Sequence, residues 1–181
     1  LLRAKDSDDQ TIELEIADSN VDISQGERAA AEESLSSLVA DNQRATPEAI
    51  LQFVDLRLSE GNEISDETLA LLDTMRFQYR NEPIFSQLSE NYARALIIND
   101  KPFAAIQEIE NLVDVLPEEI IVDLYDQVAH RILEKQDIGT ILEYGFSGHI
   151  FESSNEIPRA FADELRELGF ESRANEIVSG L

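Results

Sequence analysis

Hydrophobic residues recur every three or four positions along most of this chain, the spacing that places side chains on one face of an α-helix. A clear case is the set of Leu88, Tyr92 and Leu96, which are separated by about one helical turn each. Similar stripes follow one another along the chain. We predict helices whose apolar stripes span residues 31–39, 50–58, 69–79, 85–96, 106–113, 121–132, 138–142, 161–168 and 174–178.

Residues that favour helix starts precede several of these stripes. Thr46 and Pro47 suit an N-cap and the first helical position, and Ser65 suits the N-cap of the next helix. Ser24 and Glu27 have the spacing of a capping box in front of the first stripe. These signals predict that the helices begin near residues 24, 47 and 66.

The predicted helices are joined by short connections. Gly61 and Gly169 are placed to end helices, and most connections are about two to six residues long. Connections of that length make consecutive helices antiparallel neighbours. The sequence therefore predicts an all-α protein built from antiparallel helix pairs.

The first 25 residues differ from the rest because acidic residues crowd them. We predict an acidic, extended or partly disordered segment at 1–25 and a single α-helical repeat domain at 26–181. Within the acidic segment, residues 11–16 alternate polar and apolar side chains, which is typical of a half-buried strand. The alternative is an extended tail packed on a helix.

Composition narrows the function classes. The chain has 181 residues, no cysteine and a formal net charge of −24, from 38 acidic and 14 basic residues. That charge repels nucleic acid and anionic lipid, and the apolar runs are too short to span a bilayer. We therefore expect a soluble protein with no nucleic-acid partner and no membrane insertion, in the cytoplasm or in an extracytoplasmic space such as the periplasm. Because the chain opens with Leu1 rather than Met, we expect a processed or excised fragment.

Proline spacing indicates a repeat. Prolines at 47, 83, 117 and 158 are separated by 36, 34 and 41 residues, about one helix pair per interval. Segment 86–117 carries Ala93, Ala105 and Pro117 at the spacing of a tetratricopeptide repeat, a 34-residue helix–turn–helix unit, which it resembles. A partial match recurs at 169–174.

The segment departs from the tetratricopeptide pattern at three positions. Ser89 stands where the family often has an aromatic residue, Asp100 where it has a turn glycine, and Leu112 where it has a second alanine. An irregular helical bundle is the alternative architecture.

The resemblance implies a short right-handed α-solenoid in which the first helix of each pair lines a concave surface. The groove-facing positions that it implies in the best-matching unit are Gln87, Glu90, Arg94, Ile97 and Ile98. A peptide could lie along these positions. The alternative for Ile97 and Ile98 is that both pack against the next helix pair.

A local concentration of positive charge stands out in the acidic chain. It comprises Arg76, Arg80, Arg94 and Lys101. These residues could clamp a carboxylate terminus or an acidic peptide, as some tetratricopeptide domains do. The simpler interpretation is that they form salt bridges to neighbouring Asp and Glu residues.

No pattern in the sequence indicates catalysis or a cofactor. His130 lies one helical turn from both Asp126 and Glu134, an arrangement better explained by a solvated polar face than by a metal site. His149 lies in an apolar loop at 145–151, which we expect to fill a gap between helix pairs.

We therefore expect a non-catalytic scaffold that binds a protein or peptide partner, with no metal and no cofactor. The alternatives are a structural subunit that acts by homo-oligomerisation and, more distantly, an accessory domain of an enzyme.

Overall fold

The computed structural model describes residues 2–41, 45–135 and 156–179, and within these ranges every regular element is an α-helix. The prediction of an all-α protein is confirmed. The predicted helix at 138–142 and the loop at 145–151 lie outside the described residues. The helices are α1 (Leu2–Gln25), α2 (Arg28–Ala40), α3 (Pro47–Ser59), α4 (Asp66–Gln78), α5 (Phe85–Ile98), α6 (Pro102–Leu112), α7 (Glu118–Lys135), α9 (Glu156–Glu167) and α10 (Glu171–Ser179).

Two of the predicted N-caps are confirmed. The hydroxyl of Thr46 accepts a 3.2 Å hydrogen bond from the amide of Ala49, and Pro47 occupies the first turn of α3. The hydroxyl of Ser65 likewise accepts from the amide of Thr68 at the start of α4. Each cap satisfies one of the amides that the first turn of a helix leaves without an intrahelical partner.

The predicted strand at 11–16 is wrong, because this segment lies inside α1. The acidic segment is therefore helical and not extended. Ile12, 5% exposed, packs with Leu38 of α2, and Ile16 lies half-buried one helical turn further on. Leu14, which shared the alternating pattern, is 65% exposed because it lies on the opposite face of the helix. The spacing of Ile12 and Ile16 fits a helix, and packing against α2 selects that conformation.

The predicted capping box at Ser24 and Glu27 is also wrong. Ser24 lies within α1, where its hydroxyl donates to the carbonyl of Val21 at 2.7 Å. Glu27 is the N-cap of α2 but makes no side-chain capping hydrogen bond. The chain instead turns at Gly26, whose φ of +85° suits a residue without a Cβ.

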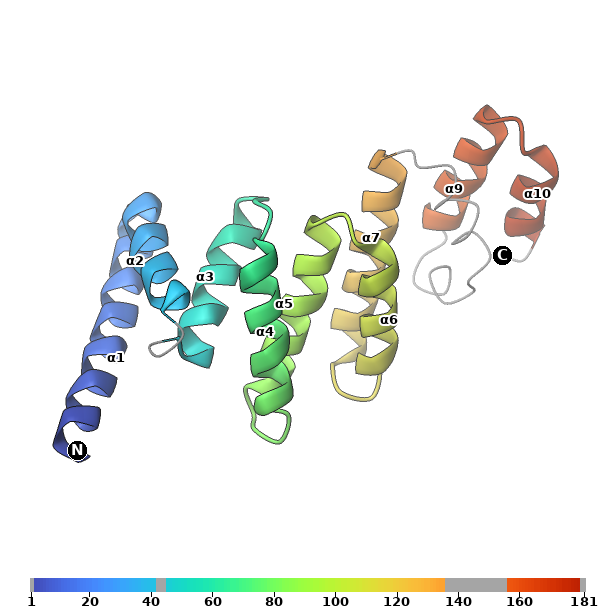
Figure 1. The fold of residues 1–181 in the computed structure, drawn as a ribbon. Helices are drawn as coiled ribbons and strands as arrows, with labels where there is room; N and C mark the ends of the chain where they lie inside the picture. Colours follow the sequence, from blue (N-terminus) through green and yellow to red (C-terminus); the bar gives the residue numbers. More distant parts are fainter. Residues whose placement is uncertain (1, 42–44, 136–155, 180–181) are drawn as a thin grey trace. The chain divides into compact units, whose positions relative to one another are not determined.

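Residues 1–99 form one compact unit. Within it, α1 packs on α2, α3 packs on both α2 and α5, and α4 packs on α5. Consecutive helices of this unit run in alternating directions (Figure 1). Its core contains fully buried side chains from each helix from α2 to α5: Leu35, Leu38, Ile50, Leu72 and Leu88.

Residues 100–181 form a second compact unit. In its described part, α6 packs on α7, α7 on α9, and α9 on α10. Phe161 and Leu165 of α9 are fully buried, as are Ile109 and Leu112 of α6. Val113, which we expected on the apolar stripe of α6, is 54% exposed because the helix ends at Leu112. That 26–181 folds as a single domain stays a prediction.

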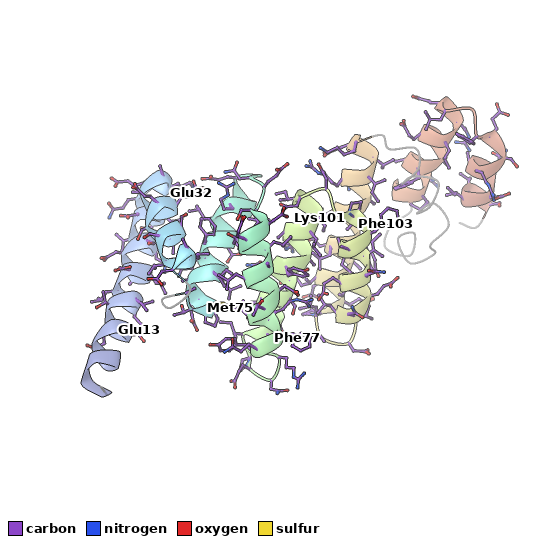
Figure 2. The ribbon with its side chains drawn as sticks, viewed as in Figure 1. Glu13, Glu32, Met75, Phe77, Lys101 and Phe103 are labelled. Atoms are coloured by element: carbon purple, nitrogen blue, oxygen red, sulfur yellow. The ribbon has the colours of Figure 1, made fainter. Side chains whose placement is uncertain are left out.

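The apolar surface of α4 shows how tightly burial follows helix geometry. Met75 is 7% exposed, whereas Phe77, two residues further along the same helix, is 68% exposed (Figure 2). Positions two apart on a helix point about 200° apart, so only one of them can face the core. None of the described helices combines the length and hydrophobicity that a bilayer-crossing segment requires.

Candidate functional site

A groove of about 440 Å³ lies between α3 and α5. It is here called the α3–α5 groove. Four of its lining residues come from α3, three from α5 and one from the N-cap of α5. They are Glu48, Leu51, Gln52, Asp55, Ile84, Gln87, Glu90 and Asn91.

Helical spacing explains why these residues meet. The α3 residues lie at positions 48, 51, 52 and 55, and the α5 residues at 84, 87, 90 and 91, so each set forms one stripe of its helix. The α3 stripe includes one apolar residue, Leu51, which lines the groove and is 7% exposed. Ile84 is half-buried at the other wall. The groove therefore has apolar surface beneath a polar rim.

Asp55 and Asn91 are joined across the groove. The side-chain amide of Asn91 donates a 2.7 Å hydrogen bond to Oδ1 of Asp55, although the two residues are 36 positions apart. Asn91 is 7% exposed, so its amide is fixed by its surroundings. The bond holds α3 and α5 together and fixes the position of the carboxylate.

The environment of Asp55 disfavours its charged form. Loss of hydration raises the pKa of Asp55 above its ordinary value of 3.8 and outweighs the opposing hydrogen bond from Asn91. The negative charge of Glu90 raises the pKa further, and the positive charge of Arg94 lowers it in part. The ionised carboxylate therefore lacks full compensation, even though Asp55 is exposed as a residue.

Glu90 forms an internal ion pair with Arg94, one helical turn away on α5. Nε and Nη2 of Arg94 both approach Oε1 of Glu90, at 3.0 and 2.8 Å. The groove rim thus carries the carboxylates of Glu48, Asp55 and Glu90, and the single positive charge of Arg94 lies beside them. The site is consequently net negative.

Three residues of the α3 stripe carry hydrogen-bond acceptors: Glu48, Gln52 and Asp55. The carboxylates of Glu48 and Asp55 are exposed at the groove, and Asn91 donates to Oδ1 of Asp55. Oε1 of Gln52 has no hydrogen-bond partner among the described residues but is buried, so a ligand reaches it only if the side chain moves. The groove therefore offers acceptors that a donor-rich ligand could satisfy.

The structure places some of the predicted groove residues in this site and others outside it. Gln87 and Glu90 line the α3–α5 groove. Arg94 does not line the groove but pairs with Glu90, which does; Ile97 is 6% exposed in the core, and Ile98 is half-buried. Whether this set binds a partner stays a prediction.

Two members of the predicted basic cluster are engaged within the protein. Arg76 pairs with Asp73 at 2.7 Å and lies 4.4 Å above the ring of Tyr92. Together with the Arg94–Glu90 pair, this confirms the salt-bridge interpretation for Arg76 and Arg94.

The other two basic residues have different surroundings. Arg80 lies 5.6 Å from the ring of Phe77, which is a cation–π distance. Lys101 is the N-cap of α6 and belongs to the unit formed by residues 100–181. None of the four basic residues lines the α3–α5 groove.

Sequence reasoning missed the α3 wall of the groove. Glu48, Gln52 and Asp55 recur at helical spacing on the face beside Leu51, a signal that was available in the sequence. What the sequence did not show is which helix faces this stripe. Asn91, the partner of Asp55, was therefore not identifiable.

The described histidine makes a local contact. The ring Nδ1 of His130 lies 2.8 Å from the carbonyl oxygen of Asp126. Glu134, the other acidic residue one turn from His130, has its Oε2 atom 3.5 Å from Nη1 of Arg131. In the described parts of the chain, no group of three or more His, Asp or Glu residues is placed to hold a metal ion.

Comparison with known proteins adds no relative. No protein-family model matches the chain, and no curated protein or solved structure is significantly similar to it. The groove itself is therefore the basis for a functional proposal.

Proposed function

We propose that this chain is a non-catalytic interaction scaffold that binds an extended segment of a protein partner in the α3–α5 groove. In this proposal the helix pairs stack as a short tetratricopeptide-like α-solenoid. Ala93 and Ala105, which carry the resemblance, are both fully buried, as small residues at helix contacts would be. The packing of α3 directly on α5 is consistent with this arrangement.

The observation that carries the proposal is the hollow between these two helices. It measures about 440 Å³, within the usual range of ligand sites, and combines apolar surface with polar groups from two helices. Such a surface can bury side chains of an extended peptide while the polar rim fixes its register. In this proposal the carboxylates of Asp55 and Glu90, which Asn91 and Arg94 hold in place, serve recognition.

Selection from a phage-displayed peptide library tests the proposal. Immobilised chain should enrich peptides that bind the wild type and lose at least about tenfold in affinity, or about 1.4 kcal/mol, on Gln87→Trp, which fills the groove. Gln107→Trp is the matched control, since Gln107 is exposed on α6 and outside the groove. Peptides that bind both variants equally, or no enrichment at all, would contradict groove binding.

A second candidate function is assembly with further copies of the chain. Leu14 and Val21 lie two turns apart on one face of α1 and are 65% and 49% exposed. Exposed apolar residues on one helix face are typical of a surface that pairs with another protein. Light scattering at rising concentration tests this alternative: a mass that increases for the wild type but not for Leu14→Ser supports assembly, and a constant monomer mass contradicts it.

A further inference from the structure

We propose that the occupant of the α3–α5 groove is a basic side chain, most suitably arginine, carried by an extended segment of the partner and bound at Asp55. This inference rests on the proposed function and adds the chemical class of the bound segment. It reverses the sign that the basic cluster of Arg76, Arg80, Arg94 and Lys101 predicts, which is an acidic partner.

The α3 wall of the groove presents carboxylate oxygens, which accept hydrogen bonds. Glu48 and Asp55 place exposed carboxylates on one stripe of α3, and Asn91 donates to Oδ1 of Asp55. A guanidinium carries five N–H donors in a planar fork and no acceptor. An arginine side chain would donate to these carboxylates, whereas a carboxylate would add further acceptors.

The groove is also net negative. Glu48, Asp55 and Glu90 face the groove, and their three negative charges outnumber the one positive charge of Arg94, which pairs with Glu90 and also acts on Asp55. A cation placed here compensates Asp55, whose ionised form is disfavoured by its surroundings. Recognition thus depends on a particular carboxylate and not on the net charge of −24 alone.

The lining of the groove also includes two apolar residues. Leu51 and Ile84 provide apolar surface next to the carboxylates. The methylene stem of an arginine can lie along such surface while its head reaches the polar rim. The hydrogen bond from Asn91 keeps the Asp55 carboxylate in position before binding, which lowers the ordering cost of recognition.

Arg76 and Arg94 already form ion pairs within the protein, which disfavours an acidic ligand at these residues. Arg76 is held by Asp73 and by the ring of Tyr92, and Arg94 is held by Glu90. An acidic ligand would have to displace these internal pairs. A basic ligand leaves them intact.

Three synthetic peptide mixtures test the inference. They have randomised flanks and a fixed central residue: arginine, its uncharged analogue citrulline, or glutamate. Their binding to the full chain is measured by competition in fluorescence anisotropy at physiological salt. We expect the arginine mixture to bind about tenfold more tightly than the citrulline mixture, the factor that about 1.4 kcal/mol represents.

Two variants separate the groove from general acidity. Asp55→Asn should abolish the arginine preference. The amide oxygen of the new side chain can still accept from Asn91, so the hydrogen bond between α3 and α5 should remain. Glu33→Gln removes one charge from an exposed position on α2 and should keep the preference. Circular dichroism checks that both variants are folded.

The possible results are distinguishable. Equal binding of arginine and citrulline mixtures to the wild type overturns the inference without need of any variant. An equal loss with Glu33→Gln and Asp55→Asn overturns it in favour of non-specific attraction, and tightest binding of the glutamate mixture overturns it in favour of the basic clamp. In each case, peptides that remain sensitive to Gln87→Trp would leave groove binding intact, whereas insensitivity to that variant would contradict the proposed function itself.

Discussion

The side chain of Asn99 makes two hydrogen bonds to the backbone of Ile64. Its Oδ1 accepts from the amide of Ile64 at 2.9 Å, and its Nδ2 donates to the carbonyl at 2.6 Å. Asn99 follows the end of α5 and Ile64 precedes the N-cap of α4, so the pair fixes the end of one helix to the start of another. Ile64 is 3% exposed, and its peptide groups therefore depend on this partner.

Asn99→Ala should destabilise the protein by about 1–3 kcal/mol, because it leaves buried backbone groups without hydrogen bonds. Urea unfolding followed by circular dichroism measures the change. Asn62→Ala is the control, since the side chain of Asn62 donates an exposed bond to the side chain of Glu60, and its loss should cost less than about 0.5 kcal/mol. Equal effects of the two variants would contradict the role assigned to Asn99.

Asp55→Asn should raise stability at neutral pH. The pKa of Asp55 is raised by loss of hydration, so the folded state binds this proton more tightly than the unfolded state. Ionised Asp55 therefore lowers the free energy of unfolding above its raised pKa, and this cost disappears as the pH falls below the ordinary value of 3.8. Urea titrations from neutral to acidic pH should show the advantage of the variant shrinking with acidification; a constant difference would contradict the assignment.

Asp100→Asn should weaken the contact between the start of α6 and α7. Oδ1 of Asp100 lies 2.7 Å from Nε of Arg131, and Oδ2 lies 2.7 Å from Nζ of Lys135. Burial opposes ionisation, but these hydrogen bonds and charges together lower the pKa of Asp100. Their contribution is present above the ordinary pKa of 3.8 and is lost as the pH falls through the lowered value.

The expected loss at neutral pH is below about 1 kcal/mol, because the pairs are exposed and solvent screens them. Asn also tolerates the left-handed backbone of residue 100, whose φ is +54°. High salt should reduce the difference between the variant and the wild type in thermal unfolding. A difference unchanged by salt would show that the charges are not its cause.

Ser89→Ala should stabilise the protein by about 1 kcal/mol. The hydroxyl of Ser89 is fully buried on α5 and has no hydrogen-bond partner in the part of the chain that the structure describes, so removing it relieves a desolvation cost. Alanine is also the better helix former, and Ser37→Ala, at an exposed position on α2, measures that part alone. A gain no larger than that of Ser37→Ala would mean that the buried hydroxyl costs nothing.

Local signals were enough to predict most of the helices. Thr46 with Pro47, and Ser65, begin α3 and α4 as expected, because an N-cap acts within its own first turn. The repeating apolar residues of α5 likewise predicted its buried face. The same local reasoning failed at residues 11–16, because a short alternating run fits a strand and a helix face alike, and only contact with α2 decides between them.

The candidate site could be predicted only in part. Gln87 and Glu90 were expected in a groove and line one, since a helix stripe can be read from spacing. The opposite wall, with Asp55 and Gln52, depends on which helix packs against α5, and that is a contact between segments about 36 residues apart.

The sequence by itself thus determined most of the helices, the N-caps at Thr46 and Ser65 and the strongly acidic balance, because each depends on neighbouring residues or on composition. The tertiary structure decided which polar groups face one another. It paired Arg94 with Glu90 and Asp55 with Asn91, and it left Oε1 of Gln52 buried without a donor. These contacts are the basis for our proposal of a basic ligand, because the carboxylates of Glu48 and Asp55 remain at the groove after packing.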